Sequence, residues 1–154
     1  MELTIRKAER KDLPILEEFL QQLIAVERPM DPSLEQEKFI KYYELESFID
    51  SKTAELFVAT VNRQIVGSGY GDIRQNKGHF AHREYGYVGF MFVAEAYRGK
   101  GIGGQVLEAI FDWFRSKGIK ETRLTVYEEN PSAIRAYEKV GFKKNLIEML
   151  HYLE

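Results

Sequence analysis

The sequence predicts one α/β domain in which a mixed sheet is covered by about four helices. Its 154 residues, 44% hydrophobic and 30% charged, fit a single soluble globular domain that spans residues 1–154. Strand-like and helix-like patterns follow one another in the order β-α-α-β-β-β-α-β-α-β. A glycine-rich turn joins an apolar strand to a long amphipathic helix, and this indicates a right-handed βαβ unit over residues 86–93, 102–117 and 121–127.

The first half of the chain carries three predicted strands and two predicted helices. Leu3 and Ile5 alternate with polar residues and predict a short strand. Asp12 is an expected N-cap for a helix over residues 13–27, with Pro14 in its first turn. Prolines interrupt the chain at 29 and 32, and a second helix is expected through KFIKYYELESFI, residues 38–49. Residues 55–61 and 65–73 predict a hairpin around the turn NRQ.

The second half begins with a polar loop, RQNKGHFAHRE, over residues 74–84. YGYVGFMFV, residues 85–93, is apolar on both faces, as expected of a central strand. The helix from 102 ends before Gly118, the strand TRLTVY follows, and a last helix runs from Asn130 to Gly141. LIEMLHYLE, residues 146–154, predicts a final strand.

Composition excludes several classes of protein. The chain has no cysteine, which rules out disulfides, thiolate zinc sites and a cysteine nucleophile, and we expect no metal. A net charge of −2 gives no general attraction to nucleic acid or anionic membranes, and we expect neither as a partner. The start, MELTIRKAER, is unlike a signal peptide, and no apolar run approaches the ~18 residues of a membrane span. We therefore expect a cytoplasmic protein.

The glycine-rich turn is the strongest functional signal. Gly99, Gly101, Gly103 and Gly104 fall within six positions, directly after Arg98. Glycine lets a ligand approach the backbone, and the free N–H groups at a helix start favour an anion. Arg98 and Lys100 add positive charge, so the turn predicts a phosphate site rather than a merely flexible loop.

Two common phosphate motifs fit poorly. Gly99, Gly101 and Gly104 match the dinucleotide pattern G-x-G-x-x-G, and Glu121 is a loose counterpart of the acid expected about 20 residues later. However, five residues, AEAYR, separate the strand from the glycines, and the chain is too short for two mononucleotide halves. A P-loop is excluded because Gln105 and Val106 stand where Lys and Ser/Thr are required.

RGKGIG resembles the R/Q-x-x-G-x-G/A signature of the GNAT family of N-acetyltransferases, with Arg98, Gly101 and Gly103 in the signature positions. The segment VYEENPSAIRAYEKVGF is similar to a second family segment, in which an Asn opens a helix, a Tyr follows seven residues later and the helix ends in G-F. The resemblance is firm over residues 85–142. It implies a mostly antiparallel sheet whose parallel βαβ unit lies at two splayed central strands.

The resemblance also implies acetyl-coenzyme A as cosubstrate and direct acetyl transfer to a primary amine. In the family, loop amides bind the pyrophosphate, the pantetheine arm lies between the splayed strands, and a backbone N–H at a strand bulge faces the thioester carbonyl. Carried to this chain, Tyr137 is the acid that protonates the leaving thiolate, Asn130 holds the pantetheine or a bridging water, and Phe92 or Val93 donates the N–H. The expected pyrophosphate residues are Arg98, Gly99, Lys100, Gly101, Ile102, Gly103 and Gly104.

The general base and the acceptor stay open at the sequence level. Glu84, just before the central strand, is the first candidate for the base, with His79, His82 or a water chain as alternatives. Tyr42 and Tyr43 either line an acceptor pocket or pack in the core. The acceptor is a small-molecule or peptide amine, and dimers are common in the family. The rival functions are a non-catalytic coenzyme A-binding module and a dinucleotide-binding enzyme.

Overall fold

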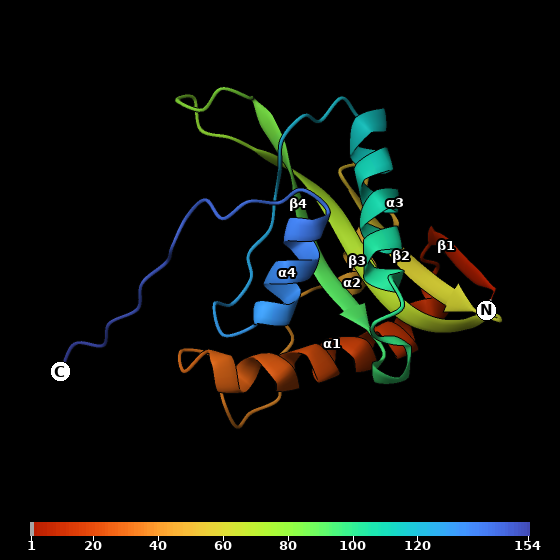
Figure 1. The fold of residues 1–154 in the computed structure, drawn as a ribbon, viewed down its shortest axis with the longest axis horizontal. Helices are drawn as coiled ribbons and strands as arrows, with labels where there is room; N and C mark the ends of the chain where they lie inside the picture. Colours follow the sequence, from red (N-terminus) through yellow and green to blue (C-terminus); the bar gives the residue numbers. More distant parts are fainter. Residues whose placement is uncertain (1) are drawn as a thin grey trace.

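The computed structural model describes residues 2–154 and holds one five-stranded sheet in the order β1-β2-β3-β4-β5. Neighbouring strands are antiparallel except β4 and β5, which are parallel. The mixed, mostly antiparallel sheet expected from the sequence is therefore confirmed (Figure 1). The strands are β1 (Leu3–Lys7), β2 (Ala54–Val61), β3 (Gln64–Gln75), β4 (Glu84–Val93) and β5 (Thr122–Arg123).

Helices cover both faces of this sheet. One core joins α1 and α2 to side chains such as Leu56, Val58 and Phe90, while a second joins α3 to Phe57, Ala59 and Val88. These two sets alternate along β2 because successive side chains of a strand point to opposite faces. Within residues 2–154 no helix is long and apolar enough to cross a membrane. The helices are α1 (Leu13–Glu27), α2 (Leu45–Ile49), α3 (Ile102–Ser116) and α4 (Pro131–Lys139), with short 3₁₀ turns η1 (Arg10–Asp12), η2 (Arg28–Met30) and η3 (Glu95–Tyr97).

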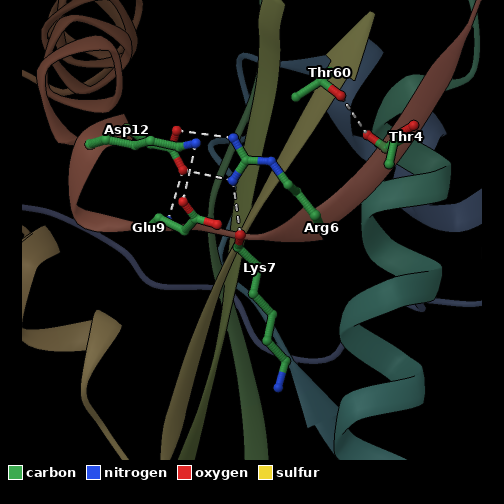
Figure 2. Close-up of polar contacts among 7 residues, drawn as sticks. Thr4, Arg6, Lys7, Glu9, Asp12 and Thr60 are labelled. Atoms are coloured by element: carbon green, nitrogen blue, oxygen red, sulfur yellow. Dashed lines mark hydrogen bonds and ion pairs between the residues drawn. The ribbon is translucent and has the colours of Figure 1, made fainter. Parts of the chain in front are cut away.

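Asp12 ties β1 to the start of α1 instead of capping that helix. Its two carboxylate oxygens accept hydrogen bonds from the Arg6 guanidinium at 2.8 and 3.0 Å, and the Glu9 N–H donates to it at 2.7 Å (Figure 2). The expected side-chain cap is therefore absent from Asp12, although Asp12 does occupy the N-cap position. The bond from Arg6 holds the pKa of the Asp12 carboxyl below its usual range.

The predicted helix over residues 38–49 is wrong for most of its length, since only Leu45–Ile49 is helical. Side chains from the α1–η2 segment occupy the backbone carbonyls that a helix would use. Gln21 donates to the Ile40 carbonyl at 2.9 Å, and Arg28 donates to the carbonyls of Glu35 and Lys38. These tertiary bonds hold the segment in an irregular path that helix propensity does not predict.

Of the two last predicted strands, the first is shorter than expected and the second is wrong. β5 comprises only Thr122 and Arg123, and residues 143–154 form no strand. Figure 1 shows this C-terminal segment leaving α4 and running away from the body of the molecule. Pairing stops early because β4 and the chain after Arg123 diverge, which confirms the splay that the family resemblance implies.

Candidate active site

A bulge interrupts β4 next to the point where it parts from β5. Tyr70 of β3 pairs with Gly89, but Ser68 pairs with Phe92, so β4 carries one extra residue. Phe90 adopts φ +53°, an uncommon conformation for a bulky residue, and the Ser68 hydroxyl donates to its carbonyl at 3.0 Å. The bulge expected from the resemblance is therefore confirmed.

The bulge also determines which backbone donors face the opening between β4 and the diverging chain. The Gly86 N–H points to β5, where it donates to the Glu121 carbonyl, whereas the Ala94 N–H points to β3 and donates to the Val66 carbonyl, both at 2.8 Å. N–H groups alternate sides along a strand. Phe92 therefore directs its N–H to β3, like Ala94, and Val93 directs its N–H into the opening.

Beyond β4, the glycine turn forms an accessible helix start. Gly99 and Gly101 have φ +75° and +80°, and Gly101 is the N-cap of α3. Added Cβ atoms at Gly99, Gly101 or Gly104 would meet nothing within 4 Å, so this backbone is open to a ligand. The N–H groups of the first turn of α3 have no partner within the helix and carry its positive dipole end. Buried Ile102 anchors the turn to the core, and Gly103 lies against Val93.

The two basic side chains of the turn lie against its flanks. Arg98 donates from Nε to the Val93 carbonyl at 2.9 Å and lies over the Phe92 ring. The Lys100 ammonium lies 5.6 Å from the centre of the Tyr97 ring. Arg98 thereby connects the turn to the end of β4, next to the Val93 N–H that is directed into the opening.

Asn130 and Tyr137 belong to α4, on the other side of the opening. Asn130 is the N-cap, and its Oδ1 accepts the Ala133 N–H at 3.3 Å. Tyr137 is half-buried and packs edge-on against Phe142. Among residues 2–154 its hydroxyl has no hydrogen-bond partner, and no fully buried side-chain oxygen in that range is left unpaired, so the hydroxyl keeps some contact with solvent. Burial, and then the charges of Tyr43, Glu27 and Tyr87, raise the pKa of Tyr137 to about 12.

Sequence reasoning missed Glu27, which lies at the end of α1 within electrostatic reach of Tyr137. The Tyr42 hydroxyl donates to the Glu27 carboxylate, and the Tyr42 ring meets Tyr43, which in turn packs on Phe90 at the bulge. Burial raises the pKa of the Glu27 carboxyl, the Tyr42 bond opposes this, and Asp31 adds to the increase. One signal was available: an acid in the last turn of a helix is disfavoured by the helix dipole.

A second carboxylate connects this region to the chain after β5. The Tyr127 hydroxyl donates to Asp31 at 2.7 Å, across 96 positions of sequence. The Tyr87 hydroxyl and the Thr125 hydroxyl, 2.8 Å apart, bridge β4 to the same diverging segment. We call Glu27, Asp31, Tyr42 and Tyr127 the acidic cluster. It combines two carboxylates with two phenols, a set that suits a cationic group.

Glu84 and the two loop histidines lie at the opposite end of β4. Glu84 begins this strand and accepts a hydrogen bond from Gln75 at 2.8 Å. Val93 lies nine positions further along this strand, which is about 30 Å of extended chain at ~3.3 Å per residue. His79 packs on Phe80, and the His82 carbonyl accepts from Asn76 at 2.9 Å. The structure thus brings together the glycine turn, Val93 and Arg98, but holds Glu84 apart from them.

Comparisons with known proteins agree with this arrangement. The model of the Acetyltransferase (GNAT) family matches residues 18–142. An uncharacterized N-acetyltransferase, YobR of Bacillus subtilis, is 40% identical over 58 residues, which are 38% of this chain and 24% of that protein. The match thus spans about a quarter of that relative's length.

Solved structures share the fold across almost the whole chain. A tetramutant of the BH1408 protein from Bacillus halodurans superposes with a TM-score of 0.85 at 21% identity, covering 97% of this chain and 99% of that one. A predicted acetyltransferase from Clostridium acetobutylicum, solved with acetyl-CoA, gives a TM-score of 0.75 at 16% identity, covering 97% and 96%.

Proposed function

Because the chain belongs to the GNAT acetyltransferase family, we propose that it transfers an acetyl group from acetyl-coenzyme A directly to a primary amine. The observation that supports this most is the bulge at Phe90, which turns the Val93 N–H into an opening between the open glycine turn and Tyr137. A thioester carbonyl in that opening meets a fixed donor on one side and a phenol on the other.

The cosubstrate is held mainly by backbone. The N–H groups of residues 99–104 bind the pyrophosphate, and Arg98 and Lys100 add charge. The pantetheine arm lies along β4 in place of the missing β5 partner, near Asn130. Phe92 contributes its ring beneath Arg98, while the donor role falls to the Val93 N–H. No metal takes part in this scheme.

The transfer needs three proton or charge adjustments. The Glu27 carboxylate accepts a proton from the amine as its nitrogen attacks the thioester carbon, and the Val93 N–H stabilises the oxyanion that forms. The C–S bond then breaks, and Tyr137 donates its proton to the departing thiolate, regaining one from solvent. A phenol with a raised pKa stays protonated at neutral pH and so remains a donor until the thiolate forms.

Glu27 fits the base role better than Glu84. The Glu27 carboxylate accepts a hydrogen bond from Tyr42, the Tyr42 ring meets Tyr43, and Tyr43 packs on Phe90 at the bulge. Glu84 lies at the other end of β4 from Val93. A carboxylate whose pKa is raised by burial is a stronger proton acceptor than an exposed one. Together with Asp31 it attracts an ammonium group, so the acceptor class we propose is a small cationic amine.

An acceptor screen tests this function. Thiol release from acetyl-coenzyme A is followed across polyamines, aminoglycosides, amino acids and short peptides, with acylated amines as blank substrates. We expect saturable turnover with at least one small amine of two or more positive charges. Saturable binding of acetyl-coenzyme A without release above the blank, across the whole panel, would favour a non-catalytic binding module. Tighter binding of NADH than of acetyl-coenzyme A would favour a dinucleotide enzyme.

A further inference from the structure

Side chains of α1 hold the irregular segment that leads to Tyr42. Gln21 donates to the Ile40 carbonyl at 2.9 Å. Glu17, about one helical turn earlier, forms an ion pair with the Lys41 ammonium at 3.1 Å. Both contacts involve residues directly before Tyr42 in the sequence, so they fix the backbone from which the Tyr42 side chain projects.

The Tyr42 side chain itself makes one polar and one aromatic contact. Its hydroxyl donates to the carboxylate of Glu27, the last residue of α1. Its ring meets the Tyr43 ring edge-on, with centroids 4.6 Å apart, and the Tyr43 ring centroid lies 5.8 Å from that of Phe90. Phe90 is the residue at φ +53° in the β4 bulge. A continuous line of contacts therefore joins the bulge to Glu27.

We propose that Tyr42 is a positioning residue for acetyl transfer: its hydroxyl orients the Glu27 carboxylate and stabilises its charge, and the Tyr43 ring fixes Tyr42 relative to the bulge. This role rests on the proposed function, in which Glu27 accepts the proton of the amine. An ionised carboxylate only accepts hydrogen bonds, so one bond from Tyr42 leaves the other lone pairs of Glu27 to an ammonium group. The bulge thus positions the Val93 N–H directly and the base through two rings.

The surroundings of Glu27 oppose its ionisation, and Tyr42 offsets them. Burial raises the pKa of the Glu27 carboxyl, Asp31 raises it further, and the hydrogen bond from Tyr42 lowers it. Removing the Tyr42 hydroxyl should therefore raise the pKa of Glu27, because the ionised form loses its donor.

The other titratable groups near Glu27 keep one charge state in the pH range where a glutamate titrates. They are Asp31 after η2, Tyr43 before α2, Tyr127 after β5 and Tyr137 in α4. The pKa values of these three phenols are raised, so the phenols stay neutral, whereas hydrogen bonds from Ser33 and Tyr127 lower the pKa of Asp31, which stays ionised. A change in the titration of Glu27 on loss of the Tyr42 hydroxyl can thus be assigned to Tyr42.

A carboxyl titration tests this role without relying on turnover. The Glu27 carboxyl carbon is followed by NMR from pH 3 to pH 9 in protein isotopically labelled at glutamate, and the Glu27→Gln variant identifies its signal. Tyr42→Phe keeps the ring and loses only the hydroxyl, and the midpoint of the Glu27 titration should move to higher pH. In Tyr85→Phe, which removes a phenol hydroxyl at the other end of β4, the midpoint should stay at the wild-type pH. An unchanged midpoint in a folded Tyr42→Phe protein overturns the proposal.

The pH–rate profile tests whether the same hydrogen bond serves the reaction. With an amine that turns over, the acid-side limb of Tyr42→Phe should move to higher pH together with the NMR midpoint. On that limb kcat/KM should fall about three- to tenfold, the size of one charged hydrogen bond discounted because Tyr42 is 41% exposed. The deficit should shrink as the pH rises, and the acetyl-coenzyme A Kd should not change.

Two results of this comparison would overturn the proposal. One is a loss of rate that is equal at every pH, which would mean that Tyr42 only packs. The other is a shifted NMR midpoint with an unshifted limb, which would mean that Glu27 is not the base. Absence of turnover with every amine would count against the proposed function instead, and the NMR titration alone would then decide whether Tyr42 acts on Glu27.

Discussion

The two sides of the sheet differ in how completely they are paired. On the N-terminal side, β1 and β2 pair over five positions. Where β1 leads into α1, the Arg6 guanidinium and the Glu9 N–H both donate hydrogen bonds to the Asp12 carboxylate. On the C-terminal side, β4 and β5 pair over two positions before they diverge, and α4 buries no side chain fully. The open side holds the bulge at Phe90, the accessible glycine turn, and Glu27 and Tyr137, whose pKa values are raised by burial. The difference teaches that the paired side provides stability, whereas the unpaired side leaves backbone donors free for a ligand.

Removing the Tyr137 hydroxyl should produce the largest loss of catalytic rate and should leave the stability of the fold unchanged. Tyr137→Phe is expected to lower kcat ten- to a thousandfold, the range of general acid catalysis, with little change in acetyl-coenzyme A affinity or Tm. Tyr85→Phe, at the far end of β4, is the matched control and should turn over normally. Normal kcat for a folded Tyr137→Phe protein, with chemistry rate-limiting, would remove Tyr137 from the mechanism.

Neutralising Glu27 should change the pH dependence as well as the rate. Because the folded pKa of Glu27 is raised, the wild-type rate should climb with pH on an acid-side limb above the ordinary glutamate value of about 4.3. In the Glu27→Gln variant the acid-side limb of the pH–rate profile should disappear, and kcat/KM for a cationic amine should fall about a hundredfold. Glu18→Gln changes an exposed acid of the same helix and should keep both. If Glu27→Gln kept the limb, a different group would be the base.

A substitution on the paired side should lower stability and leave the catalytic rate unchanged, the opposite of the two variants above. Asp12→Ala is expected to lower the free energy of unfolding by about 2 kcal/mol, typical of a lost charged hydrogen bond with partial solvent screening, without changing kcat. The folded pKa of Asp12 is depressed, so its contribution is present above the unfolded value of about 3.9 and is lost as pH falls through the folded pKa. Denaturant unfolding of both proteins from pH 7 to pH 3 checks this, since their difference should shrink at low pH.

A side chain in the glycine turn should weaken cosubstrate binding at least tenfold. Gly101→Val places a branched residue at φ +80° where the pyrophosphate approaches. Gly118→Val imposes the same strain, at φ +75° with similarly open space, at the other end of α3. Both variants should lose stability to a similar extent, and only Gly101→Val should raise the acetyl-coenzyme A Kd in calorimetric titration. Equal affinities would place the phosphate site elsewhere.

The features that could be predicted from the sequence are those that a local residue determines. The glycine turn, the N-cap at Asn130 and the end of α3 at Gly118 each follow from a residue whose backbone or side chain imposes the local structure. Features that depend on distant partners did not follow from local chemistry. Phe90 has no local preference for φ +53°, so its bulge was expected only from the family resemblance, and in the structure the Ser68 hydroxyl donates to the Phe90 carbonyl. Residues 38–44 are apolar enough for a helix, but Gln21 and Arg28 hold them in another conformation.

The candidate site shows the same limit. Tyr137 was proposed from a motif, whereas Glu27 becomes visible as a candidate only when Tyr42, 15 positions later, folds onto it. The final predicted strand, residues 146–154, had a sound hydrophobic pattern, but within residues 2–154 no strand pairs with it. A pattern predicts that a segment can form a strand, and the partner decides whether it does.

Amide hydrogen exchange with and without cosubstrate tests most directly whether the open side is the acetyl-coenzyme A site. We expect acetyl-coenzyme A to slow exchange at Val93 and across residues 99–104, with no such change in β1 and β2, and NADH at the same concentration to leave these amides unaffected. Protection confined to other regions, or protection of residues 99–104 by NADH and not by acetyl-coenzyme A, would contradict the proposed site.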